Sequence, residues 1–494
     1  MHQPSNDDGE IYLAAVEGGG TTFVVSVGRV VKHHHHHHHP HDHGAATDTE
    51  EAADSHDNHT HNETNTTLLQ IGQDTIEILH TATFPPKDAI SGIIPTWSPT
   101  QILDAVCGFL MEHRPPPPPP PPQLSVSAIN TGDKVSTTGQ YSAVGIATFG
   151  PAGVHPHKPN YGTILNGSPK KEWRNVDILT PIRKACGMES SSSSRVRFDT
   201  DVNAPALAEF RHRCYLQEQQ QQQPKQEHHL HNNEPSHHNS TAQPTTSTTP
   251  LTSLAYITIG TGVGVGLIIN SQPVHGLLHP EGGHVAICPL DQKDDTSSFA
   301  GYSWGKERSP YGGVNTVEGV ASSVALTERY MQMSSKEGNE EAHQKHEKAE
   351  DDDATTGHHL DSNSNVENTS IHRSSSTTNA QTREVLSTLP DSHPIWSHAA
   401  NAIANLCVSL LLLNSIQKIV LGGGIMKRYA LYPMIRQRVW TILNGYLDCV
   451  EELSDVQKLE SVIVEGCWVQ TNNLGSGLVG AYALALDAYD DRQS

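Results

Sequence analysis

Two glycine-rich turns, far apart in the sequence, constrain the fold of this chain more than any other feature. The first is Glu-Gly-Gly-Gly-Thr-Thr at residues 17–22, and the second is Gly-Thr-Gly-Val-Gly at residues 260–264. Each turn joins two β-rich runs, which cover residues 11–16, 22–27, 254–259 and 263–269. Because glycine has no Cβ, backbone N–H groups in such turns can approach phosphate oxygens closely. The repetition predicts a duplicated lobe in which each half presents one turn to the same ligand.

Two further glycine motifs follow strand-like or helix-like runs near the C-terminus. Gly-Gly-Gly at residues 422–424 follows a strand-like run and could form the floor for a purine ring, and Gly-Ser-Gly follows at residues 475–477. None of the motifs is a Gly-Lys-Ser/Thr nucleotide loop or a dinucleotide fingerprint, and each taken alone is also compatible with an ordinary turn. The four together favour a nucleotide site. Its candidate residues are Gly18, Gly19, Gly20, Thr21, Thr22, Gly260, Thr261, Gly262, Gly422, Gly423 and Gly424.

Acidic residues stand where a short strand meets a helix, in Phe-Asp-Thr-Asp-Val-Asn at residues 198–203. Transfer of a phosphoryl group to an alcohol requires a carboxylate that accepts the proton of the attacking hydroxyl group, and neighbouring polar groups that hold the acceptor molecule. The alternative is that Asp201 or Asn203 caps the helix. Further polar candidates are His284 in His-Pro-Glu-Gly-Gly-His, which taken alone is more often structural, and Glu318.

Five low-complexity segments interrupt the alternating strand and helix pattern. Only 35% of the 494 residues are hydrophobic and 5% aromatic, so we expect roughly 300 folded residues. The five segments cannot bury enough apolar surface to offset their ordering entropy, and we expect disordered surface loops. The seven consecutive histidines at 33–39 are interpreted as a tolerated repeat rather than a metal store. The segments cover residues of about 32–67, 115–140, 190–194, 217–249 and 334–391.

The charge balance bears on the class of partner. The chain has 32 Lys and Arg against 54 Asp and Glu, a formal net charge of −22, which argues against nucleic acid or an anionic membrane as the main partner. Its seven scattered cysteines contain no Cys-x-x-Cys pair and indicate reduced thiols. No secretory signal is evident, and the apolar run 399–413 indicates a buried helix rather than a membrane span. We therefore expect a cytoplasmic protein.

In the order of its motifs the chain resembles the ROK family of sugar kinases, and within it the bacterial fructokinase branch. The resemblance extends piecewise over nearly all the sequence outside the low-complexity segments. The pieces YGTI and FDTDVNA are specific to that branch, whereas the glycine motifs alone are not. The matching stretches are AAVEGGGTTFVVSVG, GIATFGP, YGTILNGSPKKEWRNVDIL, FDTDVNAPALAE, YITIGTGVGVGLIINSQPVHGLLHPEGGHV, KIVLGGGIM and LGSGLVGAYALA.

The resemblance implies an α/β, actin-like ATPase (ribonuclease H-like) fold whose two lobes close over ATP and a sugar. We expect an N-terminal lobe over residues 1–200 and a C-terminal lobe over 201–475. A C-terminal helix within 476–494 should then pack back on the N-terminal lobe. The implied cofactors are ATP and Mg²⁺.

The resemblance also implies roles for individual residues. Asp201 matches the family's catalytic base, and Glu17 could orient the Mg²⁺ shell through water. The glycine motifs match the phosphate loops and the adenosine site. The residues implied for the sugar are Gly150, Asn203, Glu281, His284 and Glu318.

Two departures from the family pattern concern charge and metal. Thr22 stands where the family usually has a lysine, so a phosphate-facing cation is missing there. Relatives carry a structural zinc held by a Cys-Pro-x-His-x-x-Cys cluster, but residues 299–318 contain no cysteine or histidine. His284 and Cys288 alone cannot complete a tetrahedral site, so we expect no structural zinc, with the loop held by Trp304 and Tyr311 instead.

The leading hypothesis is the reaction of ATP with fructose to give fructose 6-phosphate and ADP. A glucose, mannose or broad hexose kinase is the alternative within the same class, because pocket contacts that distinguish one hydroxyl group leave little trace in sequence. A catalytically weak sugar sensor is the alternative from another class. Family repressors carry an N-terminal helix-turn-helix, which we do not expect here because the first turn begins at residue 17. A homodimer is left open.

Overall fold

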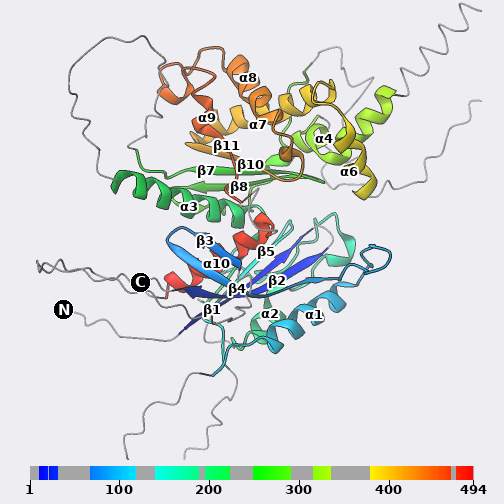
Figure 1. Ribbon diagram of the computed structural model, residues 1–494, viewed down its shortest axis with the longest axis vertical. Coiled ribbons are helices and arrows are strands. Elements are labelled where there is room, and N and C mark those ends of the chain that lie inside the picture. The colour runs from blue at the N-terminus through cyan, green and yellow to red at the C-terminus, as the bar shows by residue number, and fades with distance from the viewer. Residues whose placement is uncertain are drawn as a thin grey trace, which may run out of the picture.

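The described residues form two β-sheets that lie one above the other in the computed structural model (Figure 1). The strands from the N-terminal part of the chain form the lower sheet in this view, and those from the C-terminal part form the upper sheet. The structure describes residues 10–19, 22–31, 67–117, 139–188, 195–222, 249–290, 315–334, 379–468 and 474–492.

The first sheet has six strands in the order β3-β4-β2-β1-β5-β6. β2 and β4 extend β1 as an antiparallel meander, whereas β5 and β6 lie parallel to β1 on its other side. The strands are β1 (Ile11–Gly18), β2 (Phe23–Val31), β3 (Thr67–Ile71), β4 (Asp74–Phe84), β5 (Ala143–Thr148) and β6 (Val196–Thr200).

The second sheet has five strands in the order β11-β10-β7-β8-β9. β8 and β9 extend β7 antiparallel, and β10 and β11 lie parallel to β7 on the other side. The strands are β7 (Leu254–Ile259), β8 (Val263–Ile269), β9 (Gln272–Pro273), β10 (Lys418–Gly422) and β11 (Ile463–Glu465).

Apart from the additional edge strand β3, the two sheets share one topology. In each, an antiparallel meander of three strands is followed by two strands parallel to the first. This repeated order, with helices on the sheet faces, is that of the two-lobed, actin-like fold. The predicted fold class is therefore confirmed.

Residues 67–84 form the β3–β4 hairpin of the first sheet. Gly72 and Gln73 form its two-residue turn, and Gly72 has a φ of +64°. A left-handed conformation suits glycine in such a turn, because it has no Cβ to clash with the backbone. The added strand widens the first sheet by one edge.

Alternation along the strands divides the buried residues among three cores. On β1, Ala14 and Val16 face an outer core, whereas Leu13 and Ala15 face a central core between the sheets. Successive side chains of a strand point to opposite faces, so each sheet needs a helical layer on both sides. On β7, the set Ala255, Ile257 and Ile259 faces the outer core of the second lobe, and Leu254 and Tyr256 face the central one.

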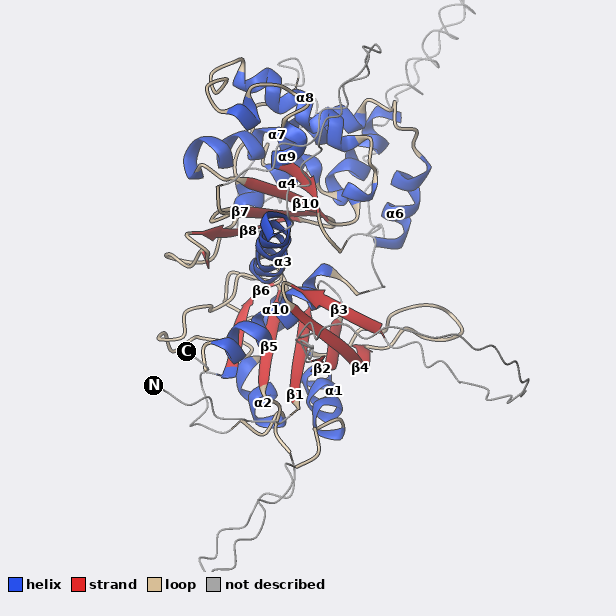
Figure 2. Ribbon diagram, turned by 60° about the vertical axis from the view of Figure 1, so that its left-hand side comes forward, coloured by secondary structure: helices blue, strands red, loops and turns tan. Residues whose placement is uncertain are grey.

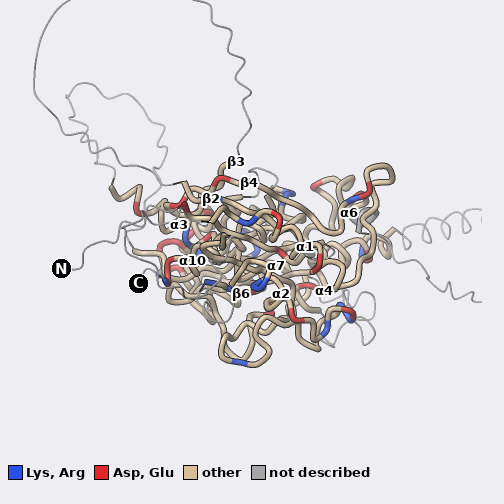
Figure 3. The backbone as a smooth tube through the Cα atoms, turned by 90° about the horizontal axis from the view of Figure 1, so that it is seen from below, with Lys and Arg blue, Asp and Glu red and all other residues tan. Residues whose placement is uncertain are grey.

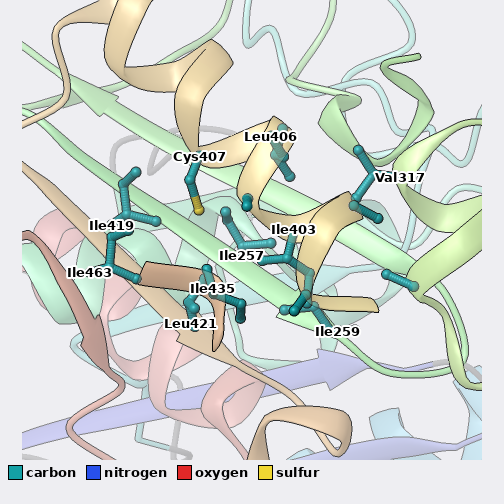
Figure 4. Packing of buried hydrophobic residues seen from close by; sticks show 14 of the residues in the cluster. Ile257, Ile259, Val317, Ile403, Leu406, Cys407, Ile419, Leu421, Ile435 and Ile463 are labelled. Carbon is teal, nitrogen blue, oxygen red and sulfur yellow. The ribbon is translucent and has the colours of Figure 1, made fainter. Parts of the chain in front are cut away.

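The outer helices cover the faces of the sheets that point away from each other (Figure 2). Ile403, Leu406 and Cys407 of α7 pack on Ile257 and Leu421 in the core of the second lobe (Figure 4). The first lobe has α1 (Pro99–Glu112) and α2 (Leu179–Ala185). The second has α4 (Val317–Ala321), a helical segment at 323–334, α6 (Asn379–Thr388), α7 (Ile395–Asn414), α8 (Leu431–Leu443) and α9 (Leu459–Val462).

Two helices form the layer between the sheets, α3 (Asn203–Gln222) and α10 (Ser476–Asp490). α10 packs against α3 and against β5 and β1 of the first sheet. Gly145 of β5 makes this approach possible, since a Cβ there would stand 1.8 Å from the carbonyl oxygen of Ala481. The last helix therefore completes the core of the first sheet.

Two segments expected to be low-complexity loops contain helix. α3 continues to Gln222, so the loop expected from residue 217 begins later. α6 lies within the segment expected at 334–391, and its Leu386 is buried in the core of the second lobe. Apolar residues within a polar stretch thus anchored a helix that composition alone did not indicate. The remaining residues of these segments lie largely outside the described part of the chain.

The long apolar helix α7 passes a test of length and composition for a membrane span, with a mean hydropathy of 1.4. Most of it, 72%, is buried inside the second lobe, as in the core helix of a globular domain.

Basic and acidic residues are interspersed along the backbone seen from below (Figure 3).

Candidate active site

Asp201 lies at the junction of β6 and α3, directly after the strand end. Its backbone N–H donates to the carbonyl oxygen of Thr148, the last residue of β5, at 2.7 Å. β1, β5 and β6 are parallel, so their carboxyl ends meet at one edge of the sheet. This places Asp201 near Gly18 and Gly19, which follow the same edge on β1.

Three carboxyl groups act on one another at this edge. Burial raises the pKa of Asp201 to about 6, an effect that the positive charge of Lys170 opposes. Burial, with a smaller effect from the charge of Asp201, also raises the pKa values of Glu17 and Glu281 to about 7. The site therefore concentrates negative charge that a cation would relieve.

Glu17 is the last residue but one of β1, and its side chain reaches the start of the last helix. Its carboxylate interacts with the backbone N–H of Leu478, in the first turn of α10, which lowers the pKa of Glu17 against the effect of burial. A Cβ on Gly477 would stand 2.2 Å from Oε1 of Glu17, so glycine leaves room for the carboxylate. The helix N-terminus thus helps to hold Glu17 at the site.

Lys170 was not a candidate from the sequence. Its Nζ donates to the carbonyl oxygen of Gly19 at 2.9 Å and lies 3.3 Å from the ring centroid of Phe149. Burial lowers its pKa to about 8, while the charges of Asp201 and Glu172 act in the opposite direction. The lysine stands in the quoted stretch YGTILNGSPKKEW, but a lysine in a loop has no periodicity that would distinguish it from a surface residue.

Glu281 lies close to two histidines. Its carboxylate oxygens are 3.7 Å from Nδ1 of His279 and 3.8 Å from Nε2 of His284, and burial lowers the pKa of both imidazoles. Nε2 of His279 accepts the backbone N–H of Ala152 at 3.1 Å. The same ring contacts Gly150, where a Cβ would stand 2.9 Å away. Glu281, His284 and Gly150 are therefore gathered in one region.

Asn203 differs from the expected sugar contact. It has no exposed surface, its amide N donates to Oδ1 of Asp199 at 3.1 Å, and its amide O accepts the N–H of Leu267 at 3.3 Å. Asp199 also contacts Nε2 of His275 at 2.7 Å. Asn203 thus supports the framework beneath the site in this structure, and its role as a sugar ligand stays a prediction.

The second glycine turn is held by an acidic side chain. Oε2 of Glu318 accepts the backbone N–H of Val263 at 2.8 Å, and the carbonyl oxygen of Gly260 accepts the N–H of Ser323 at 2.7 Å. Glu318 begins α4 and is 5% exposed. The structure therefore brings Glu318 to the turn at 260–263, and its role as a sugar ligand stays a prediction.

A cavity of about 1120 Å³ opens beside the second turn. Gly260 and Gly424 face open space, since a Cβ on either would meet no atom within 4 Å. Gly423 has a φ of +87° and lies against the backbone of Ile259, which restricts this position to glycine. The candidate residues that line the cavity are Gly260, Thr261, Gly423 and Gly424.

Several residues of this cavity escaped the sequence reasoning. The hydroxyl group of Tyr256 pairs with that of Ser476 at 2.9 Å, and the Arg428 guanidinium lies 4.1 Å from the Trp396 ring. Trp468 lines the side near Glu209. An open, glycine-lined cavity with aromatic and cationic groups fits an adenine nucleotide.

The first turn is described in part. The N–H of Gly19 donates to the carbonyl oxygen of Thr22 at 2.9 Å, and Gly18 is buried against Phe23 and Thr148. Gly20 and Thr21 lie outside the described residues. So does most of the stretch considered for zinc, including Trp304 and Tyr311. Within the described part of the chain, no group of three or more metal-ligating side chains forms a metal site.

Comparisons with known proteins extend this picture. The model of the ROK family matches residues 245–487. A fructokinase from Zymomonas mobilis is 28% identical over 348 residues, covering 70% of this chain and 79% of the relative. A fructokinase from Pediococcus pentosaceus is 25% identical over 363 residues, covering 74% and 88%.

Solved structures were also found. A ROK hexokinase from Thermus thermophilus covers 98% of this chain and 99% of its own, with 15% identity and a TM-score of 0.47. A ROK family glucokinase from Streptomyces griseus, in complex with glucose and AMPPNP, covers 98% and 100%, with 17% identity and a TM-score of 0.45.

The family match covers the second glycine turn, the His-Pro-Glu-Gly-Gly-His motif and the Gly422–Gly424 motif, and the fructokinase relatives extend over most of the folded chain. The repeated strand order is the topology expected of such a protein. These matches support a sugar kinase of the ROK family, similar to the fructokinases.

Proposed function

We propose that this protein phosphorylates a hexose with ATP. Its preferred hexose in this proposal is fructose, which is converted to fructose 6-phosphate. The chain is a sugar kinase of the ROK family, and the curated relatives named above are fructokinases. The proposal is carried by one observation: a half-buried carboxyl group, Asp201, stands at the edge of the first sheet beside the first glycine turn.

Asp201 acts as the general base in this proposal. A pKa of about 6 leaves it ionised at neutral pH and still basic enough to accept the proton of a primary hydroxyl group as phosphoryl transfer proceeds. Glu281 and His284, gathered nearby, hold sugar hydroxyls. The glycine turns hold the phosphates, and the cavity beside Gly423 and Gly424 holds the adenosine.

The carboxylates of Glu17 and Asp201 fit a Mg²⁺ bound with ATP, because a divalent cation would stabilise the charged form of both carboxyl groups, whose pKa values burial raises. Glu17 would orient the water shell of the ion. The ion would neutralise the charge of the triphosphate. We place the reaction in the cytoplasm, where ATP and hexoses meet.

Glucose and mannose are the alternative substrates. The solved ROK glucokinase with glucose and AMPPNP shows that this family includes a glucose enzyme. Discrimination between hexoses depends on single hydroxyl contacts, and the pocket residues Glu281 and His284 can hydrogen-bond either sugar.

The test is a coupled ADP-release assay of the full chain with fructose, glucose, mannose and N-acetylmannosamine. We expect turnover with fructose and a loss of about 10³-fold in kcat for Asp201→Asn, because the general base is removed while sugar binding survives. Asp104→Asn, an exposed carboxylate on α1, is the matched control and should keep the wild-type rate.

Two outcomes would contradict the proposal. Wild-type turnover by Asp201→Asn would remove the assigned base. Sugar binding by calorimetry without turnover on any hexose in the panel would instead favour the sensor hypothesis.

A further inference from the structure

Lys170 lies between the first glycine turn and the catalytic edge of the first sheet. It precedes the short 3₁₀ turn Lys171–Trp173, whose Trp173 stacks on Phe23 at 4.9 Å between ring centroids. This packing fixes the loop over the end of β1. From there the Lys170 ammonium reaches the carbonyl oxygen of Gly19 and the face of Phe149.

We propose that Lys170 contacts the transferring phosphoryl group and supplies the cation that Thr22 does not provide at the first turn. This inference rests on the proposed kinase function and adds a catalytic residue to it. The ammonium has three donors, of which the Gly19 carbonyl takes one, so two remain for phosphate oxygens.

The surroundings of the ammonium favour a ligand-directed role. No carboxylate of the described residues forms a salt bridge with Nζ, so its charge is not neutralised by a direct partner. The Phe149 ring excludes water from one side and attracts the cation through its face. A partly desolvated ammonium held in this way interacts more strongly with an anion than one in water.

Charge balance at the site points the same way. Glu17, Asp201 and Glu281 already bring three carboxyl groups together, and a triphosphate would add further negative charge. Among the described residues, Lys170 provides the positive charge that lowers the pKa of Asp201. A fixed cation at this point stabilises the charge that develops on the phosphoryl oxygens during transfer.

The charged groups around Lys170 and Asp201 determine the direction in which kcat changes with pH. Lys170 is acted on by Asp201 and Glu172, and Asp201 by Lys170, while Glu17 and Glu281 feel the charge of Asp201. Loss of the ammonium would raise the pKa of Asp201, so the acid limb of kcat would move to higher pH. Deprotonation of Lys170, whose pKa is about 8, would lower kcat on the alkaline side.

The experiment measures kcat and KM from pH 5 to 10 for the full-length wild type, Lys170→Met, Lys170→Arg and Lys171→Met. Lys171 is the exposed neighbouring lysine and serves as the matched control. We expect Lys170→Met to lower kcat about 100-fold, the usual effect of losing one electrostatic contact to a transition state. Sugar KM should change little, and thermal unfolding should show that the variant is folded.

The other variants sharpen the test. Lys170→Arg should recover much of the rate and keep it at alkaline pH, because a guanidinium does not deprotonate there. Lys171→Met should match the wild type. A folded Lys170→Met variant within threefold of wild-type kcat would overturn the inference and leave the kinase function intact.

A slow Lys170→Met variant whose acid limb has not moved would also overturn it, since a lysine that only clamps the loop would not act on Asp201. A wild-type chain without turnover on any hexose would overturn the proposed function first, and this inference with it.

Discussion

The two glycine turns stand at equivalent places in two sheets of the same strand order, yet side chains of opposite charge hold them. At the first turn the Lys170 ammonium donates to a carbonyl oxygen, that of Gly19. At the second, the Glu318 carboxylate accepts a backbone N–H, that of Val263. The duplicated strands supply the same backbone bend twice, whereas the loops that cross each bend supply different electrostatics.

Because of this difference, we expect the two turns to have different tasks. The first turn lies beside Asp201, and the positive charge of Lys170 acts on this carboxyl group. The second lies beside the cavity of Gly423 and Gly424, with its backbone fixed by an acidic group. Changes at the first turn should therefore act on kcat, and changes at the second on the binding of ATP.

Glu318→Ala tests the second half of this contrast. The Val263 N–H would lose its acceptor in a buried place, so we expect a loss of about 2 kcal/mol in the free energy of unfolding. The loosened turn should raise the KM for ATP about 10-fold, by roughly 1.4 kcal/mol of binding. Urea unfolding and steady-state kinetics with both substrates measure these effects.

Glu318→Gln is the matched control, because its amide oxygen can still accept the Val263 N–H. Recovery of stability and of ATP KM in this variant would support the clamp. A rise in sugar KM with ATP KM unchanged would show instead that Glu318 acts as the sugar ligand that the family resemblance implies.

Asp201→Asn tests how much the ionised carboxyl group of Asp201, beside the first turn, lowers the free energy of unfolding. The folded pKa of Asp201, about 6, lies above its ordinary value of 3.8, so the folded protein holds this proton more tightly than the unfolded chain. Stability is therefore lost as pH rises from about 4 to 6, and the cost persists above pH 6. At pH 7.5 the variant should be more stable by about 1–2 kcal/mol, although nearly inactive.

Unfolding measured at pH 4 and at pH 7.5 checks this result. The gain should largely disappear at pH 4, where the carboxyl group is protonated in the folded state and only about half ionised in the unfolded chain, whose ordinary pKa is 3.8. An equal gain at both pH values would mean that the substitution acts through packing rather than charge.

His275→Gln tests a contact that both lobes share. His275, in the loop after β9, meets Asp199 of β6 at 2.7 Å, and this partner raises the pKa of the imidazole despite burial. Its stabilising effect is fully present below about pH 6.5 and declines as pH rises through the raised folded pKa. We expect the variant to lose about 1 kcal/mol at pH 5.5 and less at pH 8.5.

Chemical denaturation at the two pH values measures this smallest effect. A pH-independent loss would show that the imidazole bridges the lobes in its neutral form, by hydrogen bonding alone.

Local patterns in the sequence identified much of the frame. Alternating apolar residues gave the hairpin of β7 and β8 to the residue. The start of α1 has a comparable local basis, because the Ser98 hydroxyl accepts the N–H of Gln101 and Pro99 is the first helical residue. These signals are local, because a strand or a helix cap depends on neighbours in the chain.

Residues whose role depends on distant partners were harder to interpret. Lys170 donates a hydrogen bond to Gly19, 151 residues away, and Asn203 forms hydrogen bonds with Leu267 and Val274. Asp201 could be predicted as the base because the family resemblance supplied its context, whereas its pKa depends on burial that no motif encodes. The segment at 379–388 is polar in composition, yet its Leu386 is buried in the core of the second lobe.

The position of α10 has a consequence for synthesis of the chain. Residues 476–490 are made after all the other described elements, yet they fill the core against β1 and β5, which are made much earlier. On the ribosome these strands have one apolar face uncovered until residue 490 has emerged. Nascent chains stalled before residue 476 should therefore be captured by chaperones.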